Sequence, residues 1–367
     1  MTILITLRTL SIFKFILPVC MYLHCNVSSA VEINGYVIDN ISKLPVSDVH
    51  IYSTNNLRTG TVTNENGKFS IYLKSYDTLV FSHINYKTLI IYPPETKKDL
   101  RIELEQNETM LEEITVTTLS PRQIVEKAIK NLRDNHFVEP INYSFFTRFI
   151  RYQKDSTLDI IEEYAGNIYF KKNHNALFLF KKSRAKMGVN TSEKFNSQRM
   201  TGMSKMYIDN TFKYLDDYLH PGKYKHYEYE FVDYLVLDER PMCKIKFYTN
   251  KDTYYKSGFL IIDAVTYAVA QNILNPKNGY ADKVLKYKMV NNKWHLSYTK
   301  DVLHSIAGFI NERITLYNIS NEAINSEYLS TSSVHTRKTN KFVAEYEKDF
   351  WHDSNHIILP EWLKKQL

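Results

Sequence analysis

The sequence predicts a mainly β protein with an N-terminal seven-stranded β-sandwich, a connecting helix and a C-terminal large curved antiparallel sheet with a few helices. Three observations support this fold class. Short β-like runs recur about every ten residues between residues 31 and 104, and longer alternating runs fill residues 140–367. The chain of 367 residues also contains 28 Tyr and 19 Phe but only 10 Gly and 10 Pro. Many aromatic residues with few turn formers favour long strands.

Residues 1–30 have the pattern of a signal peptide. Arg8 and Lys14 are their only charges, an apolar run follows from Phe15 to Leu23, and Ser28–Ala30 supply small residues for cleavage. The run is too short for an ordinary transmembrane helix. We therefore expect an exported protein whose mature chain begins at Val31.

Cysteine usage is compatible with export. An alternative lipoprotein signal would use Cys25, but His24 stands where a small residue belongs. Loss of the signal also removes Cys20 and leaves Cys243, so no intrachain disulfide is expected. Because Cys243 lies in an apolar alternation, we interpret it as a buried small side chain rather than a nucleophile.

The charge balance argues against nucleic acid as a partner. The formal net charge of +7 falls to +5 when Arg8 and Lys14 leave with the signal, and Lys and Glu are interspersed. There is no arginine-rich block or basic helix of the kind that binds nucleic acid.

Residues 31–104 contain seven short β-like runs separated by turn residues. The pair Asn66-Gly67 is a strong hairpin signal, and it precedes the alternating residues Phe69, Ile71 and Leu73. Seven short strands in about 75 residues predict a small β-sandwich. The runs are INGYVID, DVHIYST, RTGTVT, GKFSIYL, DTLVFSH, KTLIIY and LRIEL.

The order of residues in this region resembles a known family. Gly35 and Val37 are followed by Pro45-Val46 and Val49, then by GTVTNENGKFSI and LVFSHINYKT. This order is similar to the carboxypeptidase-regulatory-like domain, a transthyretin-like sandwich common at the start of Gram-negative envelope proteins. The usual T-D-x-x-G-x-F signature is Thr63–Phe69 here, with Asn in place of Asp. The resemblance implies an accessory domain, in the periplasm or associated with the outer membrane, and does not imply an activity.

A carboxypeptidase activity would need zinc ligands. The H-x-x-E spacing does occur at His136–Glu139, but Pro140 follows it and the segment leads from a helix into a strand. Such a platform is poor for two rigid ligands. We interpret this match as chance and predict no metal site and no cofactor.

Residues 105–139 form the joint between the two β regions. Leu111–Thr118 (LEEITVTT) resembles the short box that TonB-dependent transporters offer to their energising partner. We favour the alternative, a last strand or linker strand that pairs within this chain, because too few residues follow for a transporter barrel. Ser120 then predicts an N-cap, with Pro121 at the first helical position and Gln123 completing a capping box. The apolar stripe of this helix is Ile124, Val125, Ala128, Ile129 and Leu132.

Residues 140–367 contain about ten longer strands, mostly with one polar face, which predicts a large curved antiparallel sheet. By alternation, Tyr227, Tyr229, Phe231, Leu235 and Leu237 should share one face. The same reasoning groups Leu285, Tyr287 and Met289 and, on the next strand, Trp294, Leu296, Tyr298 and Val302. Residues 191–219 are expected to hold a helix or lid-like insertion, and residues 345–367 a helical cap.

A second resemblance concerns this sheet. YYKSGFLIIDAVTYAVAQNIL is similar to the G-x-x-x-I-D-x-x-T-x-A hairpin of lipoprotein-carrier-like half-barrels, and DFWHDSNHII resembles the F-W-x-x-x-N ending of envelope proteins that join both domains. The carriers hold acyl chains on the concave face of the sheet, so the resemblance implies an apolar groove. The candidate ligand or partner face is Tyr227, Tyr229, Phe231, Leu285, Tyr287, Met289 and Trp294.

The remaining chemical candidates have simpler structural explanations. His352 and His356, with Asp353 nearby, could share a helical face, but we expect them to be exposed, as we do His220 and His226 beside a Pro-Gly turn. Asp263 belongs to a hairpin turn, where Asp commonly bonds its own backbone. Glu228 and Glu230 have the spacing of a carboxylate pair, which solvated edge charges explain as well.

Three functional hypotheses follow. The first is a non-enzymatic envelope binding or accessory protein, with the sandwich for protein or glycan contact and the curved sheet for an apolar ligand or a partner. The second is a cryptic hydrolase, although no G-x-S-x-G, H-E-x-x-H or P-loop motif is present. The third is an outer-membrane component, which the Lys and Glu residues on the strand faces oppose.

Overall fold

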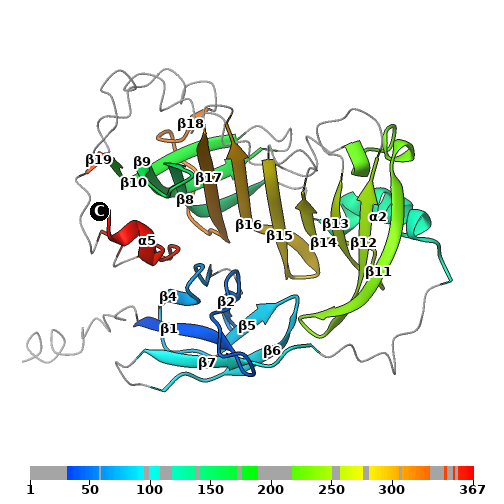
Figure 1. Cartoon of the computed structure of the whole chain (residues 1–367), viewed down its shortest axis with the longest axis horizontal. Coiled ribbons are helices and arrows are strands. Elements are labelled where there is room, and N and C mark those ends of the chain that lie inside the picture. Colours follow the sequence, from blue (N-terminus) through cyan, green and yellow to red (C-terminus); the bar gives the residue numbers. More distant parts are fainter. Residues whose placement is uncertain are drawn as a thin grey trace, which may run out of the picture.

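The N-terminal region of the computed structural model is a sandwich of two sheets (Figure 1). The structure describes residues 31–57, 59–94, 99–107, 118–136, 140–171, 176–188, 217–249, 257–275, 281–305, 308–330, 343–344, 350–351 and 354–367. One sheet has the order β4-β1-β7 and the other β3-β2-β5-β6. Their strands are β1 (Val31–Asp39), β2 (His50–Ser53), β3 (Gly60–Val62), β4 (Lys68–Leu73), β5 (Leu79–His83), β6 (Tyr86–Ile91) and β7 (Leu100–Leu104). The predicted seven-stranded sandwich is therefore confirmed.

The apolar sides of the two sheets form one core. Val37 and Ile71 of the first sheet and Ile51 of the second are fully buried. Phe69 and Phe81 meet edge to face across the sandwich with ring centroids 5.5 Å apart. Gly67 makes the turn before β4, with φ of +71° and with the Val37 carbonyl oxygen only 2.4 Å from where a Cβ would lie. The Asn-Gly hairpin signal thus marks a position that only glycine fits without strain.

The predicted helix is α2 (Pro121–Asn135), and its capping box is confirmed. The Ser120 side chain accepts a hydrogen bond from the Gln123 backbone, and the Gln123 side chain accepts one from the Ser120 N–H. The predicted stripe faces the protein, with Ile124 and Val125 fully buried.

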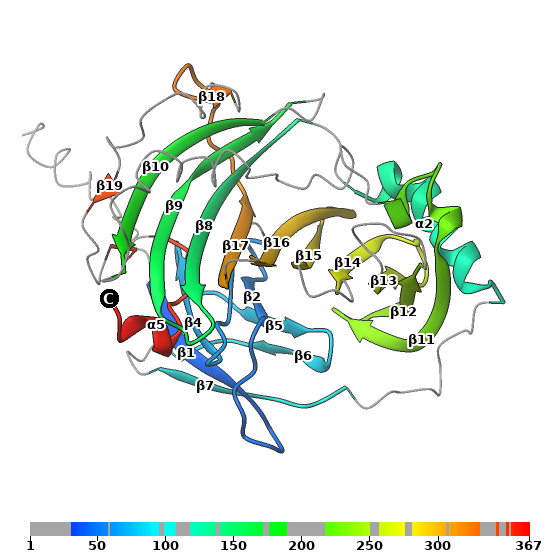
Figure 2. The same cartoon turned by 45° about the horizontal axis from the view of Figure 1, so that its top comes forward.

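The second region is one sheet of twelve strands (Figure 2). Its order is β11-β12-β13-β14-β15-β16-β17-β8-β9-β10-β18, with β19 also pairing with β10. The strands are β8 (Ile141–Gln153), β9 (Leu158–Phe170), β10 (Ala176–Met187), β11 (Glu228–Leu237), β12 (Arg240–Tyr248), β13 (Ser257–Asp263), β14 (Val269–Leu274), β15 (Ala281–Val290), β16 (Lys293–His304), β17 (Phe309–Ile319), β18 (Leu329–Ser330) and β19 (Val343–Ala344). All pairs are antiparallel except β10–β19. The curved antiparallel sheet is confirmed, and its curvature is plain in Figure 2.

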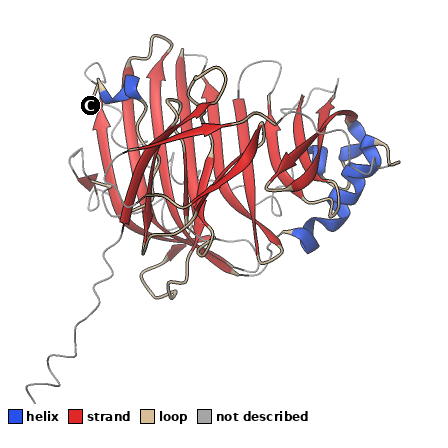
Figure 3. Ribbon diagram, turned by 90° about the horizontal axis from the view of Figure 1, so that it is seen from below, coloured by secondary structure: helices blue, strands red, loops and turns tan. Residues whose placement is uncertain are grey.

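The two faces of this sheet have different neighbours. On the helix face, side chains such as Ile245 and Leu260 pack against α2. On the opposite face, which we call the sandwich face, Tyr298 and Leu316 pack near Val62 of the sandwich. Figure 3 shows α2 at the β11 end of the sheet. Two short 3-10 helices, η2 (Asp217–Leu219) and η3 (Tyr224–His226), also belong to the β11 end.

Two register shifts correct the predicted faces. The pairing of β11 with β12 skips Val232, so Leu235 and Leu237 lie on the face opposite to Tyr229. The pairing of β15 with β16 skips Ser297, so Tyr298 lies opposite to Trp294. An extra residue in one strand reverses every later side chain, which simple alternation cannot show.

The predicted C-terminal helical cap is mostly wrong. Among the described residues of this segment only α5 (Glu361–Lys364) is helical, and residues 355–360 have no regular secondary structure. Their backbone groups bond to side chains of both β regions, which replaces the hydrogen bonds of a helix. The signal peptide, residues 111–117, residues 191–216, and His352 with Asp353 lie outside the described residues.

No helix among the described residues is long and apolar enough to cross a membrane.

Candidate functional site

The predicted ligand face is divided among different environments. Tyr227 and Tyr229 are buried beneath α2 and the 3-10 helices, where the Tyr229 hydroxyl donates to the Tyr218 carbonyl at 2.6 Å. Arg122 of α2 donates to the Tyr227 carbonyl at 2.9 Å. Phe231, by contrast, is 40% exposed and contacts Tyr234. These tyrosines therefore hold the helix on the sheet.

The other half of this face is a core around His136. Leu285, Tyr287 and Trp294 are buried together, with Met289 partly buried beside them. The ring of His136 meets that of Tyr287 with centroids 5.0 Å apart. Ligand binding by these residues stays a prediction, since the side chains are packed against one another.

His136 has a structural role. Its Nε2 lies 2.9 Å from the Val269 carbonyl oxygen and its Nδ1 lies 3.2 Å from that of Leu132. Burial lowers the pKa of His136 to about 4, although both carbonyls favour the charged ring. Both ring nitrogens face backbone oxygens, so the zinc interpretation of the H-x-x-E spacing gains no support. Glu139 lies outside the described residues.

Two further candidates have the structural roles that the sequence indicates. The Asp263 carboxylate accepts from the Val265 and Thr266 N–H groups at 2.9 and 2.7 Å and pairs with Arg240 at 2.6 Å. Cys243 is fully buried, and burial raises its pKa to about 11. Neither group is placed for chemistry.

The possible carboxylate pair is two separate ion pairs. Glu228 lies 3.3 Å from Arg122, and Glu230 lies 3.1 Å from Lys246. Hydrogen bonds from Tyr248 and Lys246 lower the pKa of Glu230. Both carboxylates are exposed and therefore match the solvated edge charges expected from the sequence.

The predicted histidine candidates are also separate. His220 and His226 are exposed, and His220 accepts from the Gly222 N–H at 3.0 Å. His356 is instead half-buried against Phe146, and burial lowers its pKa. In the described part of the chain no group of three or more His, Cys, Asp or Glu side chains could hold a metal ion.

A polar cleft of about 680 Å³ lies between the sandwich and the sandwich face of the sheet. The loop between β2 and β3 and the residue after β4 line one side. A row across β8, β9 and β10, the end of β17 with the residues that follow it, and a C-terminal segment complete it. Its lining residues are Asn56, Thr59, Lys74, Ser144, Phe145, Phe146, Ala165, Gly166, Asn167, Lys181, Lys182, Asn318, Ile319, Ser320, Asn321, Glu322, Ser354 and Asn355. Most of these side chains end in an amide, a hydroxyl or an ammonium group.

Hydrogen bonds hold the amides of this cleft in place. Asn318 donates to the Gly60 carbonyl at 3.2 Å, which joins the sheet to the sandwich. Asn167 is fully buried and donates to the Ser320 hydroxyl at 3.0 Å. The Asn167 Oδ1 atom has no hydrogen-bond partner among the described residues. Several of the polar side chains that line the cleft are thus held in place by hydrogen bonds within the protein.

Sequence reasoning missed this cleft because its residues come from seven separate segments of the chain. One signal was available, since Gly166-Asn167 lies inside a strand, where both residue types are disfavoured. The structure explains the glycine: a Cβ there would lie 1.9 Å from the Leu179 carbonyl oxygen.

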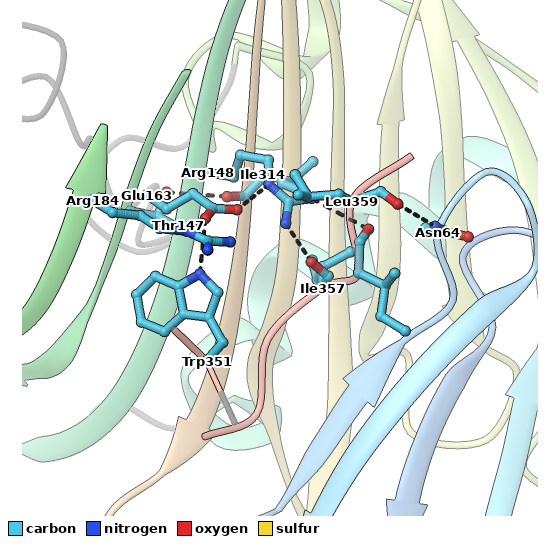
Figure 4. Close-up of polar contacts among 10 residues, drawn as sticks. Asn64, Thr147, Arg148, Glu163, Arg184, Ile314, Trp351, Ile357 and Leu359 are labelled. Atoms are coloured by element: carbon cyan, nitrogen blue, oxygen red, sulfur yellow. Dashed lines mark hydrogen bonds and ion pairs between the residues drawn. The ribbon is translucent and has the colours of Figure 1, made fainter. Parts of the chain in front are cut away.

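Next to the cleft is a buried charged network (Figure 4). The Glu163 carboxylate lies between Arg148 and Arg184, each at 2.5 Å, and accepts from the Trp351 indole at 2.8 Å. All four side chains are at most 3% exposed. Burial raises the pKa of Glu163, but the two arginines and Trp351 outweigh it, so the pKa is lowered. Arg148 also donates to the Ile357 carbonyl.

This network fixes what we call the C-terminal strap, residues 350–351 and 354–367. The strap bonds to the sandwich as well. Asn355 accepts from the Tyr72 N–H at 2.8 Å, and Asn64 donates to the Leu359 carbonyl at 3.1 Å. Trp351 and Asn355 come from the F-W-x-x-x-N ending that the sequence singled out. The strap therefore joins the two β regions.

A buried lysine, Lys286, and a half-buried one, Lys288, add a second connection. Lys286 donates to the Asp48 carbonyl at 3.0 Å, and the Lys288 ammonium lies 3.6 Å from the centre of the Tyr52 ring. Burial lowers the pKa of Lys288 to about 7. The sandwich is therefore docked through charged and polar groups as much as through apolar contact.

Comparison with known proteins agrees with this division. Residues 33–116 match the CarboxypepD_reg-like domain. The predicted resemblance of the sandwich is therefore confirmed, and this domain includes all seven of its strands. No curated protein matches the chain.

Solved structures are similar in fold to parts of the chain. A LolA superfamily protein from Nitrosomonas europaea is 10% identical, covers 60% of this chain and 99% of its own, and has a TM-score of 0.26. A putative outer membrane lipoprotein-sorting protein domain from Vibrio parahaemolyticus is 11% identical, with 59% and 100% coverage and a TM-score of 0.32. A putative membrane-associated protein from Bacteroides fragilis is 8% identical, with 82% and 98% coverage and a TM-score of 0.16. These matches concern the fold alone, and we take no ligand or activity from them.

Proposed function

We propose that this chain is a non-enzymatic binding protein of the Gram-negative cell envelope, with a glycan as the ligand of the polar cleft. The lining of the cleft carries this proposal. Amides and hydroxyls offer paired donors and acceptors, which complement the hydroxyl groups of sugars. A drug-sized or oligosaccharide ligand fits a volume of about 680 Å³.

The same lining argues against hydrolysis. Glycosidases use two carboxyl groups that flank the scissile bond. Glu322 is the one carboxylate among the described residues that line the cleft, and it is paired with Lys181 at 2.5 Å. A carboxylate held in an exposed ion pair is poorly suited to general acid catalysis, which needs a raised pKa.

The envelope location rests on different observations. Residues 1–30 have the charge and apolar pattern of a signal peptide, and the matched domain family is common in envelope proteins.

The polar cleft is preferred to an apolar groove as the binding site because Leu285, Tyr287 and Trp294 are buried in a core.

The test is a glycan array probed with the mature protein, residues 31–367, followed by calorimetry with the best-bound glycan. Asn56→Ala with Asn321→Ala removes two amides from opposite walls of the cleft. We expect Kd to rise about 30-fold, because two hydrogen bonds are lost and each contributes roughly 1 kcal/mol. Asn325→Ala is the matched control, since Asn325 is exposed and does not line the cleft. An array on which no glycan binds would contradict the proposal.

A further inference from the structure

His50 of β2 lies in the interface between the sandwich and the sheet. It lines a narrow pocket of about 30 Å³ between the two regions, which has room for roughly two water molecules. Its ring meets that of Tyr298 on β16 edge to face, with centroids 6.0 Å apart. The His50 Nε2 atom is buried and has no hydrogen-bond partner among the described residues. A positively charged ring would therefore have no acceptor oxygen at this nitrogen.

Two lysines of β15 reach the same part of the sandwich. Lys286 and Lys288 occupy alternate positions of the strand and so share one face of the sheet. The Lys286 ammonium donates to the carbonyl of Asp48, two residues before His50, at 3.0 Å. The Lys288 ammonium donates to the Leu57 carbonyl, beyond β2, at 2.6 Å. Burial and then these two positive charges hold the pKa of His50 well below its usual value.

His83 of β5 belongs to the same group of charges, since it interacts electrostatically with both His50 and Lys286. Its Nδ1 atom accepts a hydrogen bond from the Asn85 N–H at 3.2 Å, which requires that this nitrogen carries no proton. Burial and the charge of Lys286 lower the pKa of His83 to about 4, although Asp48 opposes them. The docked sandwich therefore favours the neutral form of His83 as well.

The groups around His50 supply little compensating negative charge. The Asp48 carboxylate accepts from the Tyr298 hydroxyl at 3.0 Å and interacts with Lys286, and Asp238 interacts with Lys288. No carboxylate is among the described residues that line the pocket. The titratable side chains in that lining, besides His50 and Lys288, are Tyr52, His295 and Tyr317.

We propose that the interface between the sandwich and the sheet is an acid-sensitive switch, in which protonation of His50 releases the sandwich from the sheet. The inference concerns docking itself and holds whatever the ligand of the cleft is. After release, the His50 ring is hydrated and lies away from Lys286 and Lys288, so it binds a proton near the usual pKa of about 6.5. The released state thus takes up protons that the docked state excludes, and docking weakens as the pH falls below about 6.5.

The size of this effect follows from the number of protons. The docking equilibrium constant should fall by at most about 10-fold per pH unit for each of the two histidines, His50 and His83. Because the polar cleft has walls from both regions, release of the sandwich also opens the cleft.

The test follows docking in the mature protein, residues 31–367, without any ligand. Small-angle X-ray scattering measures the radius of gyration in a urea series at several pH values between about 7.5 and about 5. Far-UV circular dichroism in the same series shows whether the sheets stay folded when the radius increases. His50→Gln removes the titration and keeps a polar side chain. His304→Gln is the matched control, because His304 is exposed at the end of β16.

We expect the radius to increase at a urea concentration that falls with pH, while the β-sheet signal persists. His50→Gln should reduce the fall of the docking constant by up to about 10-fold per pH unit, and His304→Gln should leave it unchanged. If the His50 variant does not dock at all, Lys288→Met is the second test. Removal of this ammonium makes the charged His50 less unfavourable in the docked state, so docking should weaken less on acidification.

Three results would overturn the inference. They are a docking constant that does not change between about pH 7.5 and about 5, a pH dependence that His50→Gln and Lys288→Met leave intact, and a loss of the β-sheet signal together with the change in radius.

Discussion

Replacement of Glu163 by Gln should destabilise the second region strongly. The carboxylate is fully buried between two buried guanidinium groups at 2.5 Å and also accepts from Trp351. Glutamine keeps the size and one acceptor oxygen but removes the negative charge. Breaking a buried ion pair while leaving its partner charged costs roughly 3–5 kcal/mol. Because the amide oxygen still accepts one hydrogen bond, we expect a loss of about 3 kcal/mol in the free energy of unfolding.

Urea unfolding followed by tryptophan fluorescence measures this loss, since Trp351 reports the network itself. The matched control is Glu103→Gln, which breaks the exposed ion pairs of Glu103 with Lys43 and with Arg101, each at 2.7 Å. Because solvent screens exposed ion pairs, this control should lower the free energy of unfolding far less than Glu163→Gln does. If Glu163→Gln unfolded within 0.5 kcal/mol of the unchanged protein, the network would not stabilise the fold as argued.

The pH dependence supplies a second test of the same residue. The pKa of Glu163 is lowered in the folded protein, so its contribution is fully present above the unfolded value of about 4.5. That contribution disappears as pH falls through the lower folded pKa. Glu163→Gln should therefore lose less stability on acidification than the unchanged protein does.

Three other residues give independent expectations. Cys243, with a pKa raised to about 11, should resist a thiol reagent in the native protein and react fully in denaturant. Burial lowers the pKa of Lys288 to about 7, so the folded protein disfavours the charged form of this side chain. The free energy of unfolding should therefore rise between pH 7 and about 10, by at most about 1.4 kcal/mol per pH unit from this group. Lys288→Met should flatten this rise. Gly166→Ala would place a Cβ 1.9 Å from the Leu179 carbonyl oxygen. We expect the free energy of unfolding, measured by thermal unfolding, to fall by about 2 kcal/mol. An unchanged melting temperature would mean that β10 can shift to accommodate the methyl group.

The sequence predicted best where a local pattern decides the structure. The seven strands of the sandwich, the capping box at Ser120 and the turn at Asp263 each depend on residues within a few positions of one another. Alternation failed at Val232 and Ser297, because a single unpaired residue in a strand leaves no trace in hydrophobicity. The strap was missed for a related reason. The side chains that bond to its backbone carbonyls, such as those of Arg148 and Asn64, are about 200 or more residues away in the sequence.

The cleft could not be predicted because it exists between the two regions and not within either. Its walls meet only when the sandwich docks on the sheet, through Lys286 with Asp48 and Asn318 with Gly60. Polar residues on an exposed strand face carry no sign of what will dock against them.

Strap docking and ligand binding share residues and are therefore linked. Ser354 and Asn355 line the cleft, while Asn355 also bonds to Tyr72 of the sandwich and Trp351 to Glu163 of the sheet. Phe350 of the same strap contacts Lys182 in the wall of the cleft. A ligand that contacts this wall would bind more tightly to the protein with the strap docked than to the protein with the strap released. By linkage, the ligand would then stabilise the docked strap by the difference between these two binding free energies. The buried network thus influences the proposed site through the strap, although it does not line the cleft itself.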